Sequence, residues 1–332
     1  MAEMRTPTDG VDVKGLDSDY LDCINDNLAA LLRHHGAKDV RTPFACQWHM
    51  DFDEKNGDLP LPGLERVPVA GLIVEQTGLE FVAPTDQGGD PVATCAAAVA
   101  RGQPVLAVGD AFMMPWQPYF GRQHMDHSFV VDGVSEDREL LHIADAYQNK
   151  TQWGEARPGT TWLPAMGLAP ILESSDGWQG GHLFVVEQSD ESPGEVDHRA
   201  LVAANAKHVL DELREGRVLR RFSGFYAERA DDLQAVRQFT LACWLVARAR
   251  ALHGLWLRDL SQRPEAVVDE RTAADYDERV TQPWKRVTEF SYVMERRAGA
   301  GKAPPRSAFE LLEGDVEAGE IAVAERLAEL SG

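Results

Sequence analysis

The chain has 332 residues, of which 44% are hydrophobic and 26% are charged, a composition typical of a globular protein with room for two domains. Its formal net charge of −21 argues against nucleic acid or an anionic membrane as a partner, because both would repel it. No run approaches the roughly 20 apolar residues of a membrane span, and the start MAEMRTPTDG lacks the apolar core of a secretory signal. We therefore expect a cytoplasmic protein.

Residues 17–36 (DSDYLDCINDNLAALLRHHG) predict a helix that carries Cys23 in its first turns. Its start offers three favourable N-cap residues, Asp17, Ser18 and Asp19, and Gly36 is suited to a left-handed C-cap. The positive end of the helix dipole would favour a thiolate, so Cys23 is a candidate nucleophile. The alternative is that Cys23 is a small apolar residue on the buried side of the helix.

Mixed short elements follow. We expect an extended segment at 39–53, turns at 55–68, and a buried strand or short helix at 67–75. The stretch 90–104 predicts a helix, because Pro91 is acceptable in a first turn and Gly102 with Pro104 would end it.

The densest run of predicted strands comes next. A short apolar run at 105–108 precedes a hairpin formed by 128–133 and 139–145, and a last strand covers 182–188. The connection 109–127 is long and rich in aromatic residues, and such loops are usually functional.

The polar stretch 189–197 (SDESPGEVD) predicts a hinge. Beyond it, 3.6-residue spacing predicts helices at 198–216, 231–260, 271–297 and 307–330, with a possible kink at Pro283. The expected organisation is a loose lead-in at 1–15, an α+β catalytic domain at 16–188, the hinge, and an α-helical domain at 198–332.

Three residues in chain order could form a catalytic set: Cys23 at the start of a helix, His127 at the head of a strand, and Asp145 at the end of the next strand. A thiol needs a base to remove its proton, and the imidazole base needs a partner that orients it. An antiparallel hairpin would bring His127 and Asp145 side by side. Taken singly, His127 could be a surface loop residue and Asp145 a turn-capping carboxylate.

The other cysteines and histidines are less informative. Cys95 and Cys243 lie in apolar helical stretches and are expected in the core, and the roles of Cys46 and His49 stay open. The wide spacing of the cysteines, without a CxxC pair, argues against disulfides and against a zinc site. The neighbours His124, Asp126 and His127 also lack a metal-ligand spacing, so we expect no metal.

The chain also resembles known proteins. The order of the three residues, with cysteine on a helix and histidine and aspartate on neighbouring strands, resembles that of papain-like cysteine enzymes. A narrower resemblance covers residues 16–150, with gaps: they look like the family of the butirosin biosynthesis protein H. The specific part is 104–145. The matching positions are Cys23, Asp110, Pro115, Trp116, Tyr119, His127, Val130-Val131-Asp132-Gly133 and Asp145. The family's tyrosine after the glycine is missing here, because Val134 follows Gly133.

The resemblance implies a papain-like domain, in which a helix carrying Cys23 packs on an antiparallel sheet, followed by a helical domain. It implies acyl transfer in natural-product (antibiotic) biosynthesis: Cys23 takes an acyl group from a carrier-protein thioester and passes it to an amine, forming an amide. His127 would be the base and Asp145 its orienter. No cofactor is expected on this chain, since the phosphopantetheine belongs to the acyl or peptidyl carrier protein.

Substrate contacts are less defined. Asp110 could hold an amine, and Trp116 and Tyr119 could line an acyl pocket; alternatively this loop simply covers the sheet. The glutamine that papain-like enzymes place upstream of the cysteine as oxyanion donor is absent. Asn25, Asn27 or the backbone amide of Cys23 could take that role.

A basic segment at 213–229 stands out in this acidic chain. Arg217, Arg220 and Arg221 could dock an acidic carrier protein, or they could form local ion pairs on a solvated helix end. Two other functions remain possible: a cysteine peptidase or amidase that uses the same three residues for hydrolysis, and a non-catalytic binding protein of the same fold.

Overall fold

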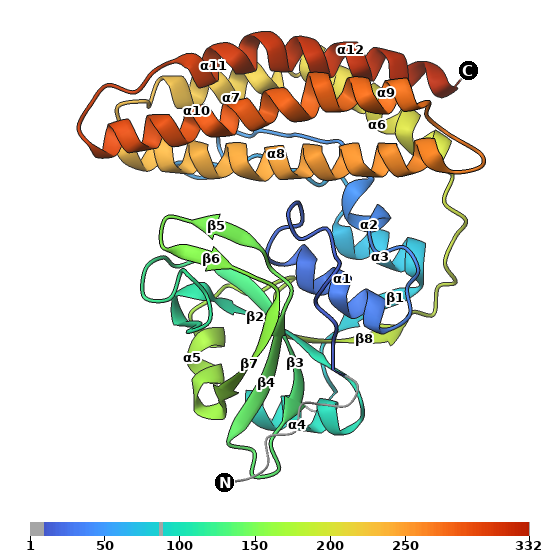
Figure 1. The fold of residues 1–332 in the computed structure, drawn as a ribbon, viewed down its shortest axis with the longest axis vertical. Coiled ribbons are helices and arrows are strands. Elements are labelled where there is room, and N and C mark those ends of the chain that lie inside the picture. Colours follow the sequence, from blue (N-terminus) through green and yellow to red (C-terminus); the bar gives the residue numbers. More distant parts are fainter. Residues whose placement is uncertain (1–9, 86–88, 332) are drawn as a thin grey trace. The chain divides into compact units, whose positions relative to one another are not determined.

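The computed structural model describes residues 10–85 and 89–331. The chain forms two compact units, and each consists of two separate stretches of sequence (Figure 1). We call Met1–Arg41 with Ala70–Gly194 the sheet unit, and Thr42–Val69 with Glu195–Gly332 the helical unit. Among the described residues, no helix has the length and apolarity that crossing a bilayer requires.

The sheet unit is an α+β structure, as expected. Its described residues form a six-stranded antiparallel sheet with the order β1 (Leu79–Val82), β8 (Leu183–Gln188), β2 (Val105–Asp110), β3 (Asp126–Val134), β4 (Leu140–Asp145) and β7 (Gly159–Pro164). A small hairpin follows β4, formed by β5 (Asn149–Thr151) and β6 (Gly154–Ala156). The predicted strands at 105–108, 128–133, 139–145 and 182–188 are confirmed, whereas β1 and β7 were not predicted.

Helices α1 (Asn25–His34), α4 (Pro91–Ala100) and α5 (Leu168–Glu173) pack on strands β2 or β3. Helix α3 (Val69–Thr77) leads into β1, and its first residue belongs to the helical unit. The helix predicted at 90–104 is confirmed as α4, with the Asp90 side chain accepting from the Val92 N–H at its start. The alternative of a short helix at 67–75 is also confirmed, as α3. Every residue of β2 is buried, which explains its uninterrupted apolar run.

The helical unit contains α2 (Thr42–Ala45), α6 (His198–Arg214), α7 (Val218–Ala227), α8 (Leu233–Gln262), α9 (Glu270–Tyr276), α10 (Gln282–Gly299), α11 (Ser307–Leu311) and α12 (Glu317–Ala328). The helix predicted at 271–297 is divided, because a π-helical turn at Asp277–Thr281 separates α9 from α10. Pro283 lies in the first turn of α10, directly after this π-helical turn, at a point where it cannot supply a helical N–H.

Residues 42–69 depart from the expected organisation. The sequence suggested that they belong to the catalytic domain, but they are part of the helical unit. Side chains from the later helices of that unit bind the backbone of residues 42–69. His253 Nδ1 donates to the Ala45 carbonyl at 2.8 Å, and the Tyr226 hydroxyl donates to the Pro60 carbonyl at 2.7 Å. The predicted hinge at 189–197 does contain the third crossing between the units, at Gly194–Glu195.

The lead-in predicted at 1–15 is only partly described, because residues 1–9 lie outside the described residues. Its described end is not loose. Val11 and Val13 are buried, and the Val11 N–H donates to Asp132 Oδ2 at 2.8 Å. This part of the chain is therefore packed into the sheet unit.

Candidate active site

Cys23 lies two residues before the first turn of α1, which begins at Asn25 and not near residue 17 as expected. The predicted N-caps are replaced by Asp22, whose Oδ1 accepts the N–H groups of Ile24 at 2.9 Å and Asn25 at 2.8 Å. The C-terminal prediction is confirmed, since Gly36 has a φ of 88°. Cys23 is thus positioned at the positive end of α1 by a turn and not by the helix itself.

Strand β3 holds Cys23 in place. Ser128 Oγ donates to the Cys23 carbonyl at 2.8 Å, and the Cys23 thiol donates to the Asp126 carbonyl at 3.4 Å. The two contacts are made by the residues on either side of His127. Cys23 is half-buried, whereas Cys46, Cys95 and Cys243 are buried.

Burial makes two of the other thiols poor nucleophiles. It raises the pKa of the Cys95 thiol to about 12, aided by the nearby charge of Asp90, and raises the pKa of the Cys243 thiol well above its ordinary value. Both lie in the core, as expected from their apolar neighbourhoods. Cys23 is the one cysteine of the four that is not buried.

The hairpin brings His127 and Asp145 to the same end of the sheet. Val130 pairs with Ala144, so Asp145 follows the partner of Val130 and lies diagonally across from His127 on the same face. His127 Nε2 lies 2.8 Å from Asp145 Oδ2. A carboxylate only accepts, so Nε2 carries the proton and Nδ1 presents its lone pair in the neutral ring.

The other ring nitrogen is chemically available. His127 is fully buried, and its Nδ1 has no hydrogen bond to any of the described residues. The ring packs edge-on against Tyr147, with centroids 5.1 Å apart. His127 is therefore a buried imidazole with one basic nitrogen that no hydrogen bond from the described residues uses, and its two neighbours in the chain contact Cys23. Such an imidazole is suited to accept the thiol proton.

Asp145 is held by hydrogen bonds to both of its oxygens. Oδ2 accepts from His127, from Trp116 Nε1 at 2.9 Å and from Gln117 Nε2 at 2.7 Å. Oδ1 accepts from the Tyr147 N–H at 3.1 Å and from Asn27 Nδ2 at 3.3 Å. Burial alone would raise the pKa of Asp145, but the His127 charge and the hydrogen bonds from His127, Trp116 and the Tyr147 N–H hold it below its ordinary value.

Gln117 was not predicted as a site residue. Its side chain is buried, and its Nε2 lies 3.1 Å from His127 Nε2 because both groups donate to the same Asp145 oxygen. The sequence feature that could have pointed to Gln117 is its position in the aromatic loop 109–127, directly after Trp116. No local pattern distinguishes it there from Gln123.

Two expected substrate contacts act on Asp145 instead. Trp116 donates to Asp145 as described above. Asn27 is fully buried on α1; its Nδ2 donates to the Ser128 carbonyl at 2.9 Å and its Oδ1 accepts the Ala146 N–H at 3.0 Å. Both N–H groups of the Asn27 amide are therefore used, by the Ser128 carbonyl and Asp145, and the Asn25 amide donates one N–H to Asp22 Oδ2 at 2.8 Å.

Asp110 and Tyr119 organise the loop between β2 and β3. Asp110 is buried; its Oδ1 accepts the Phe112 and Met125 N–H groups at 3.0 and 3.1 Å, and its Oδ2 lies 2.5 Å from His124 Nδ1. Burial would raise its pKa, but His124 and the two backbone donors lower it. Asp110 therefore has little capacity left for a substrate amine.

Tyr119 lies nearer to the thiol. It belongs to a small buried cluster with Ala111, Tyr147 and Ala156, and Cys23 and Met125 pack against this cluster. The Tyr119 hydroxyl lies 3.4 Å from that of Tyr147 and accepts from Asn149 Nδ2 at 2.9 Å. This cluster provides an apolar wall beside the sulfur.

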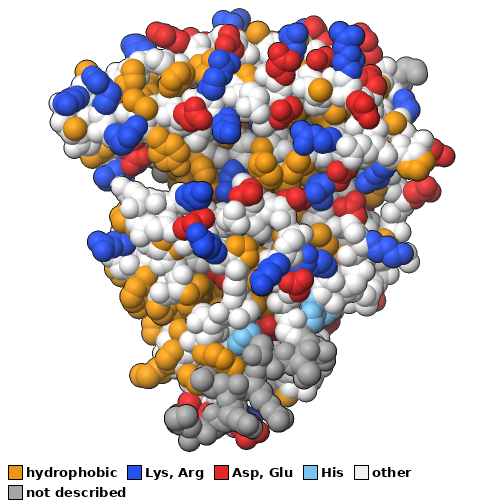
Figure 2. Space-filling model, in the orientation of Figure 1, with side chains coloured by type: hydrophobic (Ala, Val, Ile, Leu, Met, Phe, Trp, Pro, Cys, Tyr) orange, Lys and Arg blue, Asp and Glu red, His pale blue; other side chains and the backbone are white. Residues whose placement is uncertain are grey.

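Two of the arginines in the basic segment are engaged within the helical unit. Arg220 binds Glu317 with its Nε and Nη2, at 3.0 and 2.8 Å, and Arg221 donates to the Phe52 carbonyl. Arg217 is exposed, with a left-handed φ of 47° just before α7. In Figure 2, basic and acidic side chains are interspersed on the visible face of the helical unit.

The arrangement as a whole provides a reachable thiol, a base and a positioning carboxylate, which is the equipment of nucleophilic acyl transfer. No protein-family model matches the chain, and no curated protein matches it.

Proposed function

We propose that the protein is a cysteine-dependent acyltransferase, in which Cys23 accepts an acyl group from a thioester and passes it to an amine. The observation that carries the proposal is the state of His127. Its Nε2–H is committed to Asp145, while its buried Nδ1 has no hydrogen bond among the described residues and its chain neighbours bind Cys23. That nitrogen is the base that a thiol nucleophile needs.

The steps follow from the residues. His127 Nδ1 removes the thiol proton, and the Cys23 sulfur attacks the thioester carbonyl, expelling the carrier thiol, which takes up a proton. The incoming amine then attacks the Cys23 acyl thioester, gives its proton to His127, and leaves as an amide while the Cys23 thiol is restored. Asp145 stabilises the imidazolium in both halves of the reaction.

The similarity of 104–145 to the butirosin protein H family supports amide formation, whereas a papain-like arrangement of the helix and sheet supports a cysteine nucleophile in general. The acyl group would then be delivered by a carrier protein, as a thioester of the phosphopantetheine on that partner. Arg217, Arg220 and Arg221 are all exposed, but Arg220 and Arg221 have partners within the helical unit. Arg217 has no ion pair with any of the described residues and is therefore the arginine that we propose for docking.

Intact-protein mass spectrometry tests the proposal. The chain is incubated with acyl thioesters of pantetheine and of carrier proteins, alongside Cys23→Ala. We expect a mass increase equal to the acyl group, absent in Cys23→Ala, and its discharge by added amines as the amide.

Two results would redirect the proposal. If the acyl mass disappears at the same rate with and without amines, releasing free acid, the activity is hydrolysis. If Cys23 resists both thioesters and a thiol alkylator, it is a structural residue and the enzyme proposal fails.

A further inference from the structure

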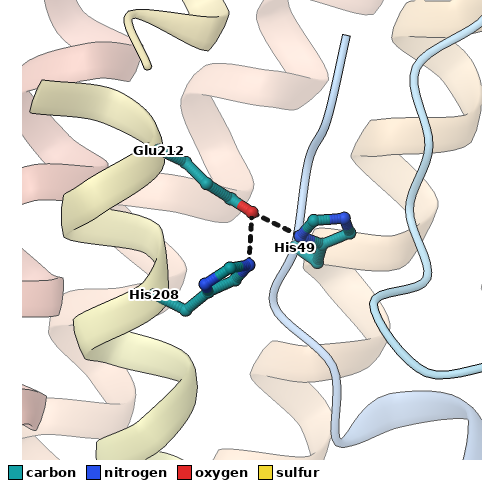
Figure 3. Close-up of side chains that lie close together, drawn as sticks. All are labelled: His49, His208 and Glu212. Carbon is teal, nitrogen blue, oxygen red and sulfur yellow. Dashed lines mark ion pairs between the residues drawn. The ribbon is translucent and has the colours of Figure 1, made fainter. Parts of the chain in front are cut away.

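A second cluster of reactive side chains lies in the helical unit, apart from the residues proposed for catalysis. His208 and Glu212 are one turn apart on α6, and His49 comes from the extended segment after α2. Figure 3 shows the three side chains turned toward one another, with one carboxylate oxygen of Glu212 joined by dashed lines to a nitrogen of each imidazole. The ligand atoms His49 Nδ1, His208 Nε2 and Glu212 Oε1 all lie within 4.8 Å of one another.

The contacts in the cluster are short but poorly directed. Glu212 Oε1 lies 2.8 Å from His208 Nε2 and forms an ion pair with His49 Nδ1. All three atoms are nevertheless buried without a properly directed hydrogen bond to any of the described residues. The lone pair of an imidazole nitrogen lies along the direction that its N–H would take. The two nitrogens are therefore not aimed at the carboxylate oxygen, although all three atoms lie within 4.8 Å of one another, and their lone pairs are not used by a hydrogen bond to any of the described residues.

Neighbouring groups hold the ligands in position. The Met50 N–H donates to Glu212 Oε2 at 3.2 Å, which leaves Oε1 for the cluster. Arg250 Nη1 donates to the His49 carbonyl at 2.9 Å, and the Arg250 charge is itself paired with Glu320 at 2.8 Å. The imidazoles of His49 and His208 are stacked, with centroids 5.2 Å apart. Such outer contacts are typical of metal ligands, whose orientation they fix.

We propose that His49, His208 and Glu212 bind a divalent transition-metal ion of the Zn²⁺ class. Two imidazoles and one carboxylate suit such an ion, whereas Ca²⁺ and Mg²⁺ prefer sites made of oxygen atoms. Tetrahedral Zn²⁺ with bonds of about 2.0–2.1 Å would separate the ligand atoms by roughly 3.3 Å, so the carboxylate must withdraw slightly from the imidazoles. Three protein ligands leave one position for water.

The ion would join two parts of the helical unit that are far apart in sequence. His49 belongs to Thr42–Val69, and the other ligands belong to α6 of the stretch that begins at Glu195. An ion that binds the folded chain but not the unfolded chain raises the free energy of unfolding by mass action. The inference is independent of the proposed acyl transfer, because none of its ligands takes part in that reaction.

The test is isothermal titration calorimetry with ZnCl₂ on the full-length chain without a histidine tag. Cys23→Ala is the background, because the Cys23 thiol could bind zinc by itself. We expect one ion per chain and a higher melting temperature with Zn²⁺. In that background, His208→Ala and Glu212→Gln should each weaken binding at least about tenfold and abolish the thermal shift. Glu212→Gln retains an acceptor for the Met50 N–H, so its fold should be kept.

His34→Ala is the matched control, because His34 is an exposed histidine outside the cluster; it should bind Zn²⁺ as the background does. Absence of binding in the background would overturn the proposal and leave the cluster as imidazole–carboxylate ion pairs. Equal binding by the background, His208→Ala and Glu212→Gln would overturn it as well, since the ion would then bind elsewhere.

Discussion

Asp132 accepts a hydrogen bond from His142 Nδ1 at 2.5 Å across the β3–β4 hairpin, at the point where the register of the two strands shifts by one residue. Nearer the hairpin loop, Gly133 pairs with His142; beyond the shift, Val131 pairs with Ile143. Without the shift, Asp145 would lie opposite Val130 and would face away from His127, because a one-residue slip moves a side chain to the other face. This bulge therefore puts His127 and Asp145 on one face of the sheet.

Asp132→Ala should damage both stability and the site. The substitution removes the acceptor for His142 and for the Val11 N–H, both of them buried, so we expect a loss of about 2–4 kcal/mol in the free energy of unfolding. Urea unfolding measures this, and the rate of Cys23 acylation should fall with it. Glu136→Ala in the exposed hairpin loop is the control. Normal acylation by a destabilised Asp132→Ala chain would show that the register does not depend on this carboxylate.

Asp145→Asn should leave the fold intact and reduce Cys23 acylation severely, by a factor on the order of 10³–10⁴. The asparagine amide can present a donor to His127 Nε2, which favours the wrong tautomer and places the proton on Nδ1. Single-turnover acylation by mass spectrometry gives the rate, and circular dichroism checks the fold. An unchanged rate would mean that another group orients His127.

Gln117→Leu should lower the acylation rate about tenfold. It removes one of the donors to Asp145 Oδ2 and the side chain beside His127 Nε2, but it leaves the His127–Asp145 hydrogen bond in place. Gln123→Leu, in the exposed part of the same loop, is the comparison. Equal rates for both variants would remove Gln117 from the site.

Arg217→Glu should slow Cys23 acylation from a carrier-protein thioester about tenfold and leave acylation from a pantetheine thioester unchanged. Reversing a charge at the rim of a docking surface mainly affects the association rate. Lys302→Glu, another exposed residue of the helical unit, makes the same change of charge and should have no effect. Loss of both rates in Arg217→Glu would indicate damage to the fold and not to docking.

His253 should make the helical unit sensitive to acid. Burial, with the nearby charge of Arg250, lowers its pKa to about 3, although donation to the Ala45 carbonyl opposes this shift. The unfolded chain takes up a proton at this residue near pH 6.5, whereas the folded chain does not until about pH 3. The free energy of unfolding therefore falls as pH decreases through this window, by up to about 1.4 kcal/mol per pH unit.

Urea unfolding of the full chain at pH 7 and pH 5.5 measures this effect. His253→Gln keeps a donor for the Ala45 carbonyl and cannot be protonated, so it should lose about 1 kcal/mol less stability between the two pH values than the unmodified chain. His34→Gln removes an exposed histidine and should behave like the unmodified chain. The same pH dependence in His253→Gln would assign the acid sensitivity to other groups.

Much of the fold could be predicted because its signals are local. Strand β2 is a short apolar run before a loop, and β3 and β4 are apolar runs joined by a polar turn. Helix α4 has Asp90 and Pro91 at its start. The long helices after the hinge repeat apolar residues at helical spacing. Each pattern fixes backbone conformation within a few residues, independently of what packs against it.

The site could be predicted only in part. Cys23, His127 and Asp145 were recognisable as residue types at the ends of elements, and their order resembles that of papain-like enzymes. The roles of Trp116, Gln117 and Asn27 could not be read in this way, since they follow from donors that converge on Asp145 from a loop and from α1. Convergence is a property of packing and leaves no local signature.

The sequence by itself determined the α+β character, the hairpin and the helical region, because hydrophobic period and capping residues act over short distances. Only the tertiary structure decided the membership of residues 42–69 in the helical unit and the meeting of His49 with α6. It also decided the bulge at Asp132, whose carboxylate accepts from the Val11 N–H and from His142. These features depend on hydrogen bonds between residues far apart in the chain or across strands, and such contacts exist only once the chain has folded.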